Sequence, residues 1–437
     1  MEIKKLFLPS IIFVFLPLVY AISPYLFLCL VILCFLLCIP INVDIDTKIF
    51  CIYLISFSFF GISLFSFKIY DLVFIIGCLF NFKKFKEGSF NRRLVFLSCV
   101  FISIIAVSIL LNLGNNPFSH MNLELFRYIL SIITLIYYSN VNLAKKAIVK
   151  FLKLFSVLLS VQTIIMFYIM QRGVIKNFYS PLFQVTLFSE DGETRLAGFF
   201  SDPNKFMCFF FFLIIFFFIF KDIWKKNDFL FLIIMLVGSL LSFSRTAILS
   251  ICIFIVLIIF NLIFQEQKYL RILLFFFVGL LVGIIVFLSP SSILNSLDNI
   301  FSWMLQILGR DRTAEINTTL SDDNRIFIWK LAIPLISENP LFGHGPISYS
   351  YLLPYPTHNT FLNLLLDYGV SGTVAYLLLM RGLFHKIPSF LSISFIMIPM
   401  LLLDMGNFRL IFVLLGLVYS INLSKGDSSI ERFGYLN

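Results

Sequence analysis

The feature that most constrains this chain is a series of apolar runs, each about as long as the hydrocarbon core of a bilayer is thick. A segment in lipid has no water to satisfy its peptide groups, so each run must form a helix that bonds within itself. The composition agrees with this, because 60% of the 437 residues are hydrophobic and only 13% are charged, whereas a soluble domain carries about 25% charged residues. The mean hydropathy is +1.00. The sequence therefore predicts an all-α polytopic membrane protein.

The apolar runs predict about fourteen membrane-spanning helices. Their approximate bounds are 6–22, 24–41, 49–66, 69–82, 94–112, 124–140, 152–171, 206–220, 229–243, 246–264, 270–288, 359–380, 388–406 and 408–422. The segment 69–82 is short, and a re-entrant helix is an alternative there.

The basic residues predict the orientation of these helices. If the N-terminus is cytoplasmic and every segment crosses, 21 of the 33 lysines and arginines fall in short cytoplasmic loops, as the positive-inside rule requires. Both termini are then expected in the cytoplasm. On this interpretation the net charge of +10 reflects the excess of basic residues in the cytoplasmic loops. We therefore expect no nucleic-acid partner.

This topology divides the chain into five regions. They are N-terminal membrane helices (1–171), an external loop (172–205), central membrane helices (206–288), a large external loop (289–358), and C-terminal membrane helices with a short cytoplasmic tail (359–437). The large loop contains a predicted amphipathic helix that starts near Arg325 and is expected to lie on the outer face. The membrane-spanning segments are almost uncharged inside, with Asp367 as the main exception.

The predicted external loop 172–205 and a short external turn further along the chain hold several candidate binding residues. Arg245 stands in a tight turn between two apolar segments, where a planar guanidinium suits phosphate oxygens; an interfacial arginine that reaches lipid headgroups is an equally good interpretation. Arg195 lies between an acidic patch and the membrane surface. Asp202-Pro203-Asn204 is a helix-start signal, and that structural role alone would explain it.

The second external loop holds the candidate base. His358 stands where the loop re-enters the membrane, and histidine is the usual general base near neutral pH, although a lone interfacial histidine is more often structural. No group of residues has metal-ligand spacing, no glycine-rich phosphate loop follows a strand, and no Gly-x-Ser-x-Gly occurs. The eight cysteines all lie in apolar runs, where buried hydrophobes are expected. We therefore expect no metal and no cofactor.

Between residues 190 and 375 the motifs resemble those of a known family. The matching segments are Arg195 with Gly198-Phe199-Phe200-Ser201-Asp202-Pro203-Asn204, then Ser244-Arg245-Thr246-Ala247, then Arg325 with Trp329, Glu338-Asn339-Pro340 and Gly343-His344-Gly345, and finally His358-Asn359 with Gly369-Val370-Ser371-Gly372. Together they resemble the bacterial O-antigen ligase/polymerase superfamily. The last segment fits that family's His-[Asn/Ser/Gln]-x9-Gly-x2-[Gly/Thr/Tyr] pattern without a departure.

The resemblance implies a GT-C-like glycosyltransferase of the bacterial inner membrane with its active site facing the periplasm. Donor and acceptor would be undecaprenyl-diphosphate-linked oligosaccharides, and a chain-length-determining co-polymerase is an expected partner besides membrane lipids. Arg245 and Arg325 would stabilise the leaving diphosphate, and His358 would accept the proton of the acceptor hydroxyl. Arg195 would hold the glycan or the diphosphate. The remaining substrate-binding candidates are Asp202, Asn204, Asn359 and His344.

Three activities are compatible with the sequence. The stretch from Gly198 to Asn204 looks more like a polymerase, which joins lipid-linked repeat units, and fourteen spans fit some polymerases better. The His358-Asn359 pattern is best known from ligases, which transfer the finished chain to lipid A-core. A lipid-linked oligosaccharide flippase would also have about fourteen spans, but it is expected to carry charges in mid-span. We favour the polymerase.

Overall fold

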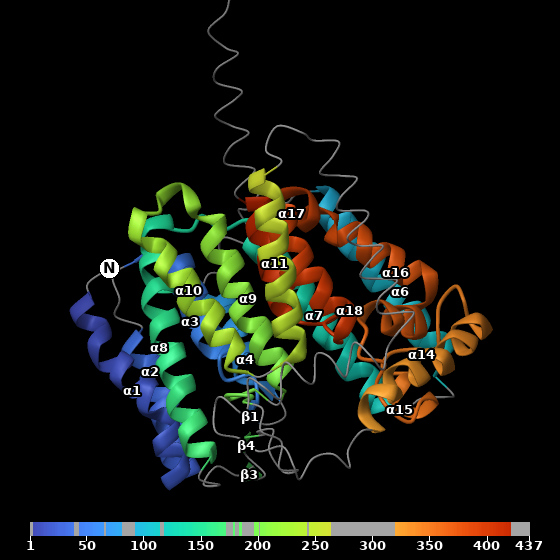
Figure 1. Ribbon diagram of the computed structural model, residues 1–437. Helices are drawn as coiled ribbons and strands as arrows, with labels where there is room; N and C mark the ends of the chain where they lie inside the picture. The colour runs from blue at the N-terminus through green and yellow to red at the C-terminus, as the bar shows by residue number, and fades with distance from the viewer. Residues whose placement is uncertain are drawn as a thin grey trace, which may run out of the picture.

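The computed structural model describes residues 3–38, 43–64, 67–80, 92–113, 118–171, 178–179, 183–185, 196–200, 202–242, 244–263 and 320–420. These residues form a bundle of helices with a small sheet at one end (Figure 1). The helices are α1 (Ile3–Ile22), α2 (Pro24–Cys38), α3 (Ile45–Phe57), α4 (Ile69–Phe80), α6 (Arg92–Leu111), α7 (Phe118–Ser139), α8 (Lys145–Gln171), α9 (Pro203–Ile219), α10 (Phe229–Leu240), α11 (Arg245–Ile263), α14 (Leu320–Glu338), α15 (Tyr349–Leu352), α16 (Thr360–Lys386), α17 (Ser389–Ser392) and α18 (Ile398–Leu402). A π-helical turn, Ile393–Met397, joins the last two, and a final helix spans Arg409–Ser420.

Two helices form the centre of the bundle. Every side chain of α9 from Phe206 to Phe217 is buried, and in the final helix all residues from 410 to 418 are buried. A helix that is apolar on all sides needs neighbours on all sides. The middle of α9 lies close to the start of the final helix, because the ring of Phe212 lies 5.6 Å from that of Phe408, the residue before that helix.

Each predicted segment overlaps a described helix except 270–288, which lies outside the described residues. Three described helices are long and apolar enough to cross a membrane by length and composition: Arg92–Leu111, Lys145–Ile169 and Thr360–Phe384. Eight further apolar helices have 10–17 residues. The protein is thus a largely helical integral membrane protein, and the number of fourteen crossings stays a prediction. The predicted amphipathic segment is helical in α14, which begins before Arg325.

The prediction of a helix over 49–66 is wrong beyond Phe57. The hydroxyl of Ser58 donates to the carbonyl of Ile55 at 2.6 Å, and the chain leaves the helix in a turn that reaches Gly61. A serine that bonds its own helix end competes with helix continuation. Two short strands come next in the chain, β1 (Ile62–Leu64) and β2 (Phe67–Lys68). Two more, β3 (Phe178–Tyr179) and β4 (Phe183–Val185), come after α8.

The strands form one antiparallel sheet in the order β2-β1-β4-β3, an element that the all-α prediction did not include. The sheet ties the segment after α3 to the predicted external loop 172–205, because Ser63 pairs with Gln184. Figure 1 shows the sheet, α14 and α15 at the same end of the bundle. We call it the strand end; the charge pattern predicts that it faces outward.

Candidate functional site

The helix that carries the C-terminal motif is broken at Gly369. This residue has a φ of 64° and a non-helical ψ inside α16, so the helical hydrogen bonds are interrupted around it. The loop after α14 satisfies the freed groups: the N–H of Val370 donates to the carbonyl of Pro340 at 2.8 Å, and that of Ser371 to the carbonyl of Leu341 at 3.2 Å. Non-helical backbone within an apolar segment is tolerated where protein supplies its partners.

The same loop pairs with α16 on the other side of the break. The N–H of His344 donates to the carbonyl of Leu366 at 2.8 Å, and the N–H of Gly345 donates to the carbonyl of Asp367 at 2.9 Å. From α6, the side chain of Asn112 donates to the carbonyl of Gly343 at 3.2 Å. The loop is therefore held by main-chain bonds to a break in a membrane-capable helix.

Two glycines of the family motif make this contact possible. Gly343 and Gly369 both have left-handed φ values, 65° and 64°. A Cβ on Gly343 would lie 2.5 Å from the carbonyl carbon of Asp367, and one on Gly369 would lie 2.4 Å from that of Leu341. Only a residue without a side chain allows both the conformation and the close approach.

Asp367, the charge that the sequence showed inside a predicted span, anchors this loop. Its carboxylate accepts hydrogen bonds from the N–H of Ile347 at 3.2 Å and from the N–H of Ser348 at 2.9 Å. The hydroxyl of Ser348 also donates to it, at 2.5 Å. A buried carboxylate needs such donors, because burial without them is costly. Asp367 therefore positions the segment that leads to His358.

His344 is buried, and both of its ring nitrogens are engaged. Its Nε2 lies 2.7 Å from the carbonyl oxygen of Leu335, and its Nδ1 lies 3.1 Å from the amide nitrogen of Asn339. A carbonyl accepts only, so Nε2 carries the proton and Nδ1 accepts from the Asn339 amide. The ring thus joins the end of α14 to the loop, which is a positioning role. The predicted binding of substrate by His344 stays a prediction.

His358 and Asn359 form the entry to α16. His358 is half-buried and has a φ of 50°, an unusual conformation for a residue other than glycine. Asn359 is the N-cap, and its side-chain oxygen accepts from the N–H groups of Phe361 at 3.0 Å and Leu362 at 3.1 Å. The cap fixes the helix start and so fixes where His358 stands. A role of Asn359 in substrate binding remains a prediction beside this structural one.

The helix of Arg325 lies next to the segment of His358. The indole N–H of Trp329 donates to the carbonyl of Thr357 at 2.8 Å, and Arg325 precedes Trp329 by about one helical turn of α14. The helix that carries Arg325 is thereby bonded to the segment that carries His358.

The other predicted arginine lies beside the motif at the start of α9. Asp202 caps that helix, accepting from the N–H of Asn204 at 2.7 Å. The side-chain oxygen of Asn204 then accepts from the hydroxyl of Ser244 at 2.6 Å, directly before Arg245 begins α11. Two motifs 40 residues apart are thus joined. Arg195 lies outside the described residues.

The segment before α9 is also tied to the sheet. The N–H of Gly61 donates to the carbonyl of Phe199 at 2.6 Å, and the ring of Phe60 stacks on that of Phe200 at 5.5 Å. Phe60 also contacts Phe408 at 5.9 Å, at the start of the final helix. The N-terminal, central and C-terminal parts of the chain therefore meet at the strand end.

Sequence reasoning missed a set of charged residues at this end. Arg409 forms a buried ion pair with Asp71, and Arg127 pairs with Glu124 at 3.0 Å. The amide of Asn407 donates to Glu124 at 2.5 Å. These charges lie in the first turns of predicted spans, and that position is the signal that could have revealed them.

The description of the spans as almost uncharged inside, with Asp367 as the main exception, is therefore wrong. Asp71 and Arg409 expose 6% and 3% of their surface, and Glu124 exposes 8%. They are tolerated because each has a polar partner: Asp71 and Arg409 pair across distant helices, and Glu124 accepts from Arg127 within α7 and from Asn407. This weakens one argument against a transporter, although the pairs are gathered at the strand end.

Two small cavities among the described residues differ in character. One, of about 20 Å³, has a polar lining drawn from α7, α15, α16 and the turn after α18. It is lined by Glu124, Tyr128, Ile347, Tyr349, Thr360, Asn363, Leu364, Asp367, Tyr368, Asp404, Gly406 and Asn407. Its size suits a single water molecule and not a sugar, so a glycan must bind outside it.

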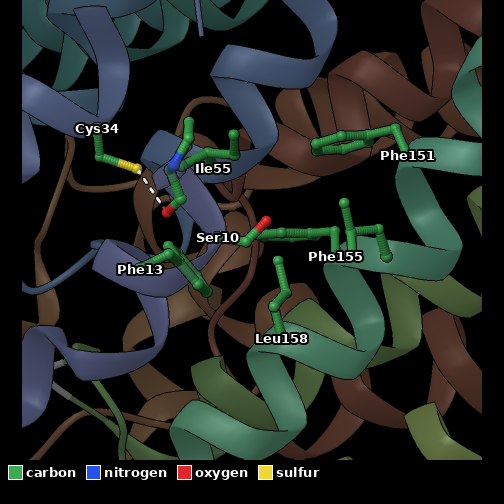
Figure 2. Close-up of a pocket in the computed structure, with 9 residues that line it drawn as sticks. Ser10, Phe13, Cys34, Ile55, Phe151, Phe155 and Leu158 are labelled. Carbon is green, nitrogen blue, oxygen red and sulfur yellow. Dashed lines mark hydrogen bonds between the residues drawn. The ribbon is translucent and has the colours of Figure 1, made fainter. Parts of the chain in front are cut away.

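The other cavity is apolar and lies away from the motifs. Figure 2 shows it between α1, α2, α3 and α8, with Phe13, Ile55 and Leu158 in its wall. Its one marked polar contact is the thiol of Cys34, 3.6 Å from the carbonyl oxygen of Pro9. The rest of its lining is apolar apart from Ser10. Among the described residues no cluster of three or more His, Cys, Asp or Glu could hold a metal ion.

Comparison with known proteins finds a family match for part of the chain. Residues 230–377 match a family model described as O-antigen ligase, a range that includes Arg245, Arg325, His344, His358 and the break at Gly369. No curated protein matches the chain. The residues brought together around the break of α16 thus lie within the range of the family model, and this match supports the O-antigen ligase/polymerase superfamily.

Proposed function

We propose that this protein is a surface-polysaccharide polymerase of the O-antigen type. It would join undecaprenyl-diphosphate-linked repeat units at the periplasmic face of the inner membrane and release undecaprenyl diphosphate. Members of the matched family are glycosyltransferase-like enzymes of lipopolysaccharide biosynthesis. The observation that carries the proposal is the gathering at the strand end of three motif segments from distant parts of the chain: 198–204, 244–247 and 325–372.

The proposed chemistry needs a cation at the leaving group and an acceptor for a proton. As the glycosidic bond to the diphosphate breaks, negative charge develops on the leaving oxygen, and Arg245 and Arg325 are proposed to stabilise it. His358 is proposed to accept the proton of the attacking hydroxyl. Its backbone is fixed by the cap at Asn359 and by the contact of Trp329 with Thr357, which supports a defined orientation for the ring.

No metal and no cofactor enters this mechanism. Arg195 is proposed to hold the glycan or the diphosphate, and Asp202, Asn204, Asn359 and His344 are proposed to contact substrate in addition to their structural bonds. A separate co-polymerase is the proposed partner for chain-length control.

A ligase is the second candidate, because the matched family model is described as O-antigen ligase. The two differ in the accepting group: another lipid-linked repeat unit for a polymerase, lipid A-core for a ligase. A lipid-linked oligosaccharide flippase is the third candidate, since buried charges of the kind seen at Asp71 and Arg409 also occur in transporters.

A gel of surface lipopolysaccharide from cells that lack the gene tests the proposal. Core that carries a single repeat unit is the expected result, since ligation still works when polymerisation fails. Core without any repeat, together with lipid-linked polymer in the inner membrane, would instead identify a ligase. Core without repeats and no polymer, with repeat units retained on the cytoplasmic face, would identify a flippase.

A further inference from the structure

The ring of Phe60 lies in an aromatic stack at the strand end. It packs on Phe200 with an interplanar angle of 5° and on Tyr70 with an angle of 17°, each at a centroid distance of 5.5 Å. Phe200 belongs to the motif before α9, and Tyr70 belongs to α4. The stack thus joins the hairpin of β1 and β2 to that motif.

Two lysines share this ring. The ammonium nitrogen of Lys68, at the end of β2, lies 5.6 Å from the ring centroid, and that of Lys205, in the first turn of α9, lies 5.4 Å from it. Each distance is that of a cation–π contact. Two like charges on one ring repel each other, and within the described part of the chain neither lysine forms an ion pair.

The nearest carboxylates already have partners. Asp71 pairs with Arg409, Glu124 accepts from Arg127 and from Asn407, and Asp202 caps α9. The positive charge of the two lysines therefore remains uncompensated among the described residues. An anion between or beside them would remove the repulsion.

We propose that Lys68 and Lys205 bind the diphosphate of a lipid-linked substrate against Phe60. Lys205 follows Asn204, whose side chain bonds Ser244, the residue before Arg245. The segment of Lys205 is thus bonded to the segment of the proposed diphosphate arginine, and a diphosphate offers enough oxygens for several cations. This inference rests on the proposed function, which supplies a diphosphate-bearing substrate. It adds residues outside the range matched to the family.

The titration of Lys68 supports the same site. Burial, followed by repulsion from Lys205 and Arg127, lowers the pKa of Lys68 to about 8, while Asp71 acts in the opposite direction. The ammonium form is present below that pH and is lost above it. Diphosphate binding is therefore expected to weaken as the pH rises through about 8.

The test uses the full-length protein in nanodiscs of phosphatidylcholine, a lipid without net charge, titrated with farnesyl diphosphate. Lys68→Gln and Lys205→Gln are each expected to weaken binding by about tenfold, the effect of removing one charged contact. Lys68→Arg should restore most of the affinity. Lys221→Gln, at the opposite end of α9 and exposed, is the matched control and should bind as the wild type does. Thermal unfolding of each variant checks that it is folded.

Three outcomes would overturn the inference. One is unchanged affinity of folded Lys68→Gln and Lys205→Gln for farnesyl diphosphate. A second is an equal loss for farnesol, which lacks the diphosphate and would report only the prenyl chain. The third is that the lysines matter only when the nanodiscs contain phosphatidylglycerol, which would make them ligands of bulk lipid headgroups.

These results are separable from a failure of the proposed function, because the binding test uses no glycan and no turnover. If the lipopolysaccharide gel excludes polymerase and ligase while the lysine variants lose farnesyl diphosphate, the anion site stands and the reaction is wrong. If the gel shows a polymerase and the variants bind normally, the reaction stands and the lysine site is wrong.

Discussion

The apolar crevice between α1, α2, α3 and α8 and the strand end of the bundle are held together by different kinds of interaction. Around Phe13 and Leu158 the walls are hydrocarbon and aromatic rings (Figure 2), so packing density decides stability and many side chains of similar volume would serve. At the strand end, ion pairs, helix caps and left-handed residues each require one particular chemistry. Variants in the two regions should therefore differ: substitutions in the crevice are expected to be tolerated, and substitutions at the strand end are expected to be costly.

The largest effect is expected from breaking the buried ion pair. Arg409→Ala leaves the carboxylate of Asp71 buried without its partner, and the free energy of unfolding should fall by about 3–5 kcal/mol. Adding Asp71→Ala to that variant should restore part of the loss, because no uncompensated charge remains. The melting temperature of the purified protein in detergent measures both. A double variant no more stable than Arg409→Ala would contradict this explanation.

The next largest effect is expected at the break in α16. Gly369→Ala forces a side chain into a left-handed conformation, which alone costs about 1–3 kcal/mol, and its Cβ would meet the carbonyl of Leu341. Gly77→Ala in α4 is the control, because there a Cβ meets only the side chain of Ile49. Thermal unfolding should show a clear loss for the first and a small change for the second. Equal changes would argue against a required break.

A smaller effect is expected in the crevice. Leu158→Met keeps the side-chain volume, and such a change costs less than about 1.5 kcal/mol in most packed sites. The length distribution of the surface polysaccharide should stay unchanged in cells that carry this variant. A loss of polymer at normal protein level would show that the crevice is part of the functional site. The crevice and the strand end would then not differ in tolerance to substitution.

The cap of α16 should give a loss of about 1 kcal/mol. Asn359→Ala removes the oxygen that accepts from Phe361 and Leu362, whereas Asn359→Ser retains a capping oxygen and should be nearly as stable as the wild type. Polymer length measured for both separates capping from substrate binding. If Asn359→Ser is stable but makes no polymer, the predicted contact with substrate gains support; if it makes normal polymer, the cap explains the residue.

The smallest change in stability, and a complete loss of polymer, are expected for His358→Asn. Asparagine tolerates the left-handed conformation found at this position, so the free energy of unfolding should change by no more than about 0.5 kcal/mol, while the imidazole is removed. Membrane level and melting temperature serve as the controls on the polysaccharide gel. Normal polymer from this variant would reject His358 as the proton acceptor.

The class of fold, most helix positions and the family resemblance could be predicted from the sequence alone. Long apolar runs leave the backbone no choice but a helix, and short motifs keep their residue types at fixed spacing. For this reason α14, the start of α9 and the segment around His358 could all be located without a structure. Residue types alone also singled out Asp367 as unusual, although they gave no reason for it.

The contacts of the residues in these segments are known only from the tertiary structure. Hydropathy averages over a window, so it could not show the end of α3 at Phe57, the small sheet, or the break at Gly369, which depends on a loop far away in sequence. The partners Asp71 and Arg409 are 338 residues apart, and Lys68 and Lys205 meet only because both reach Phe60. The buried ion pair and the main-chain hydrogen bonds at the break of α16 join segments that are distant in sequence. They form only when the helices pack together, so no local sequence pattern predicts them.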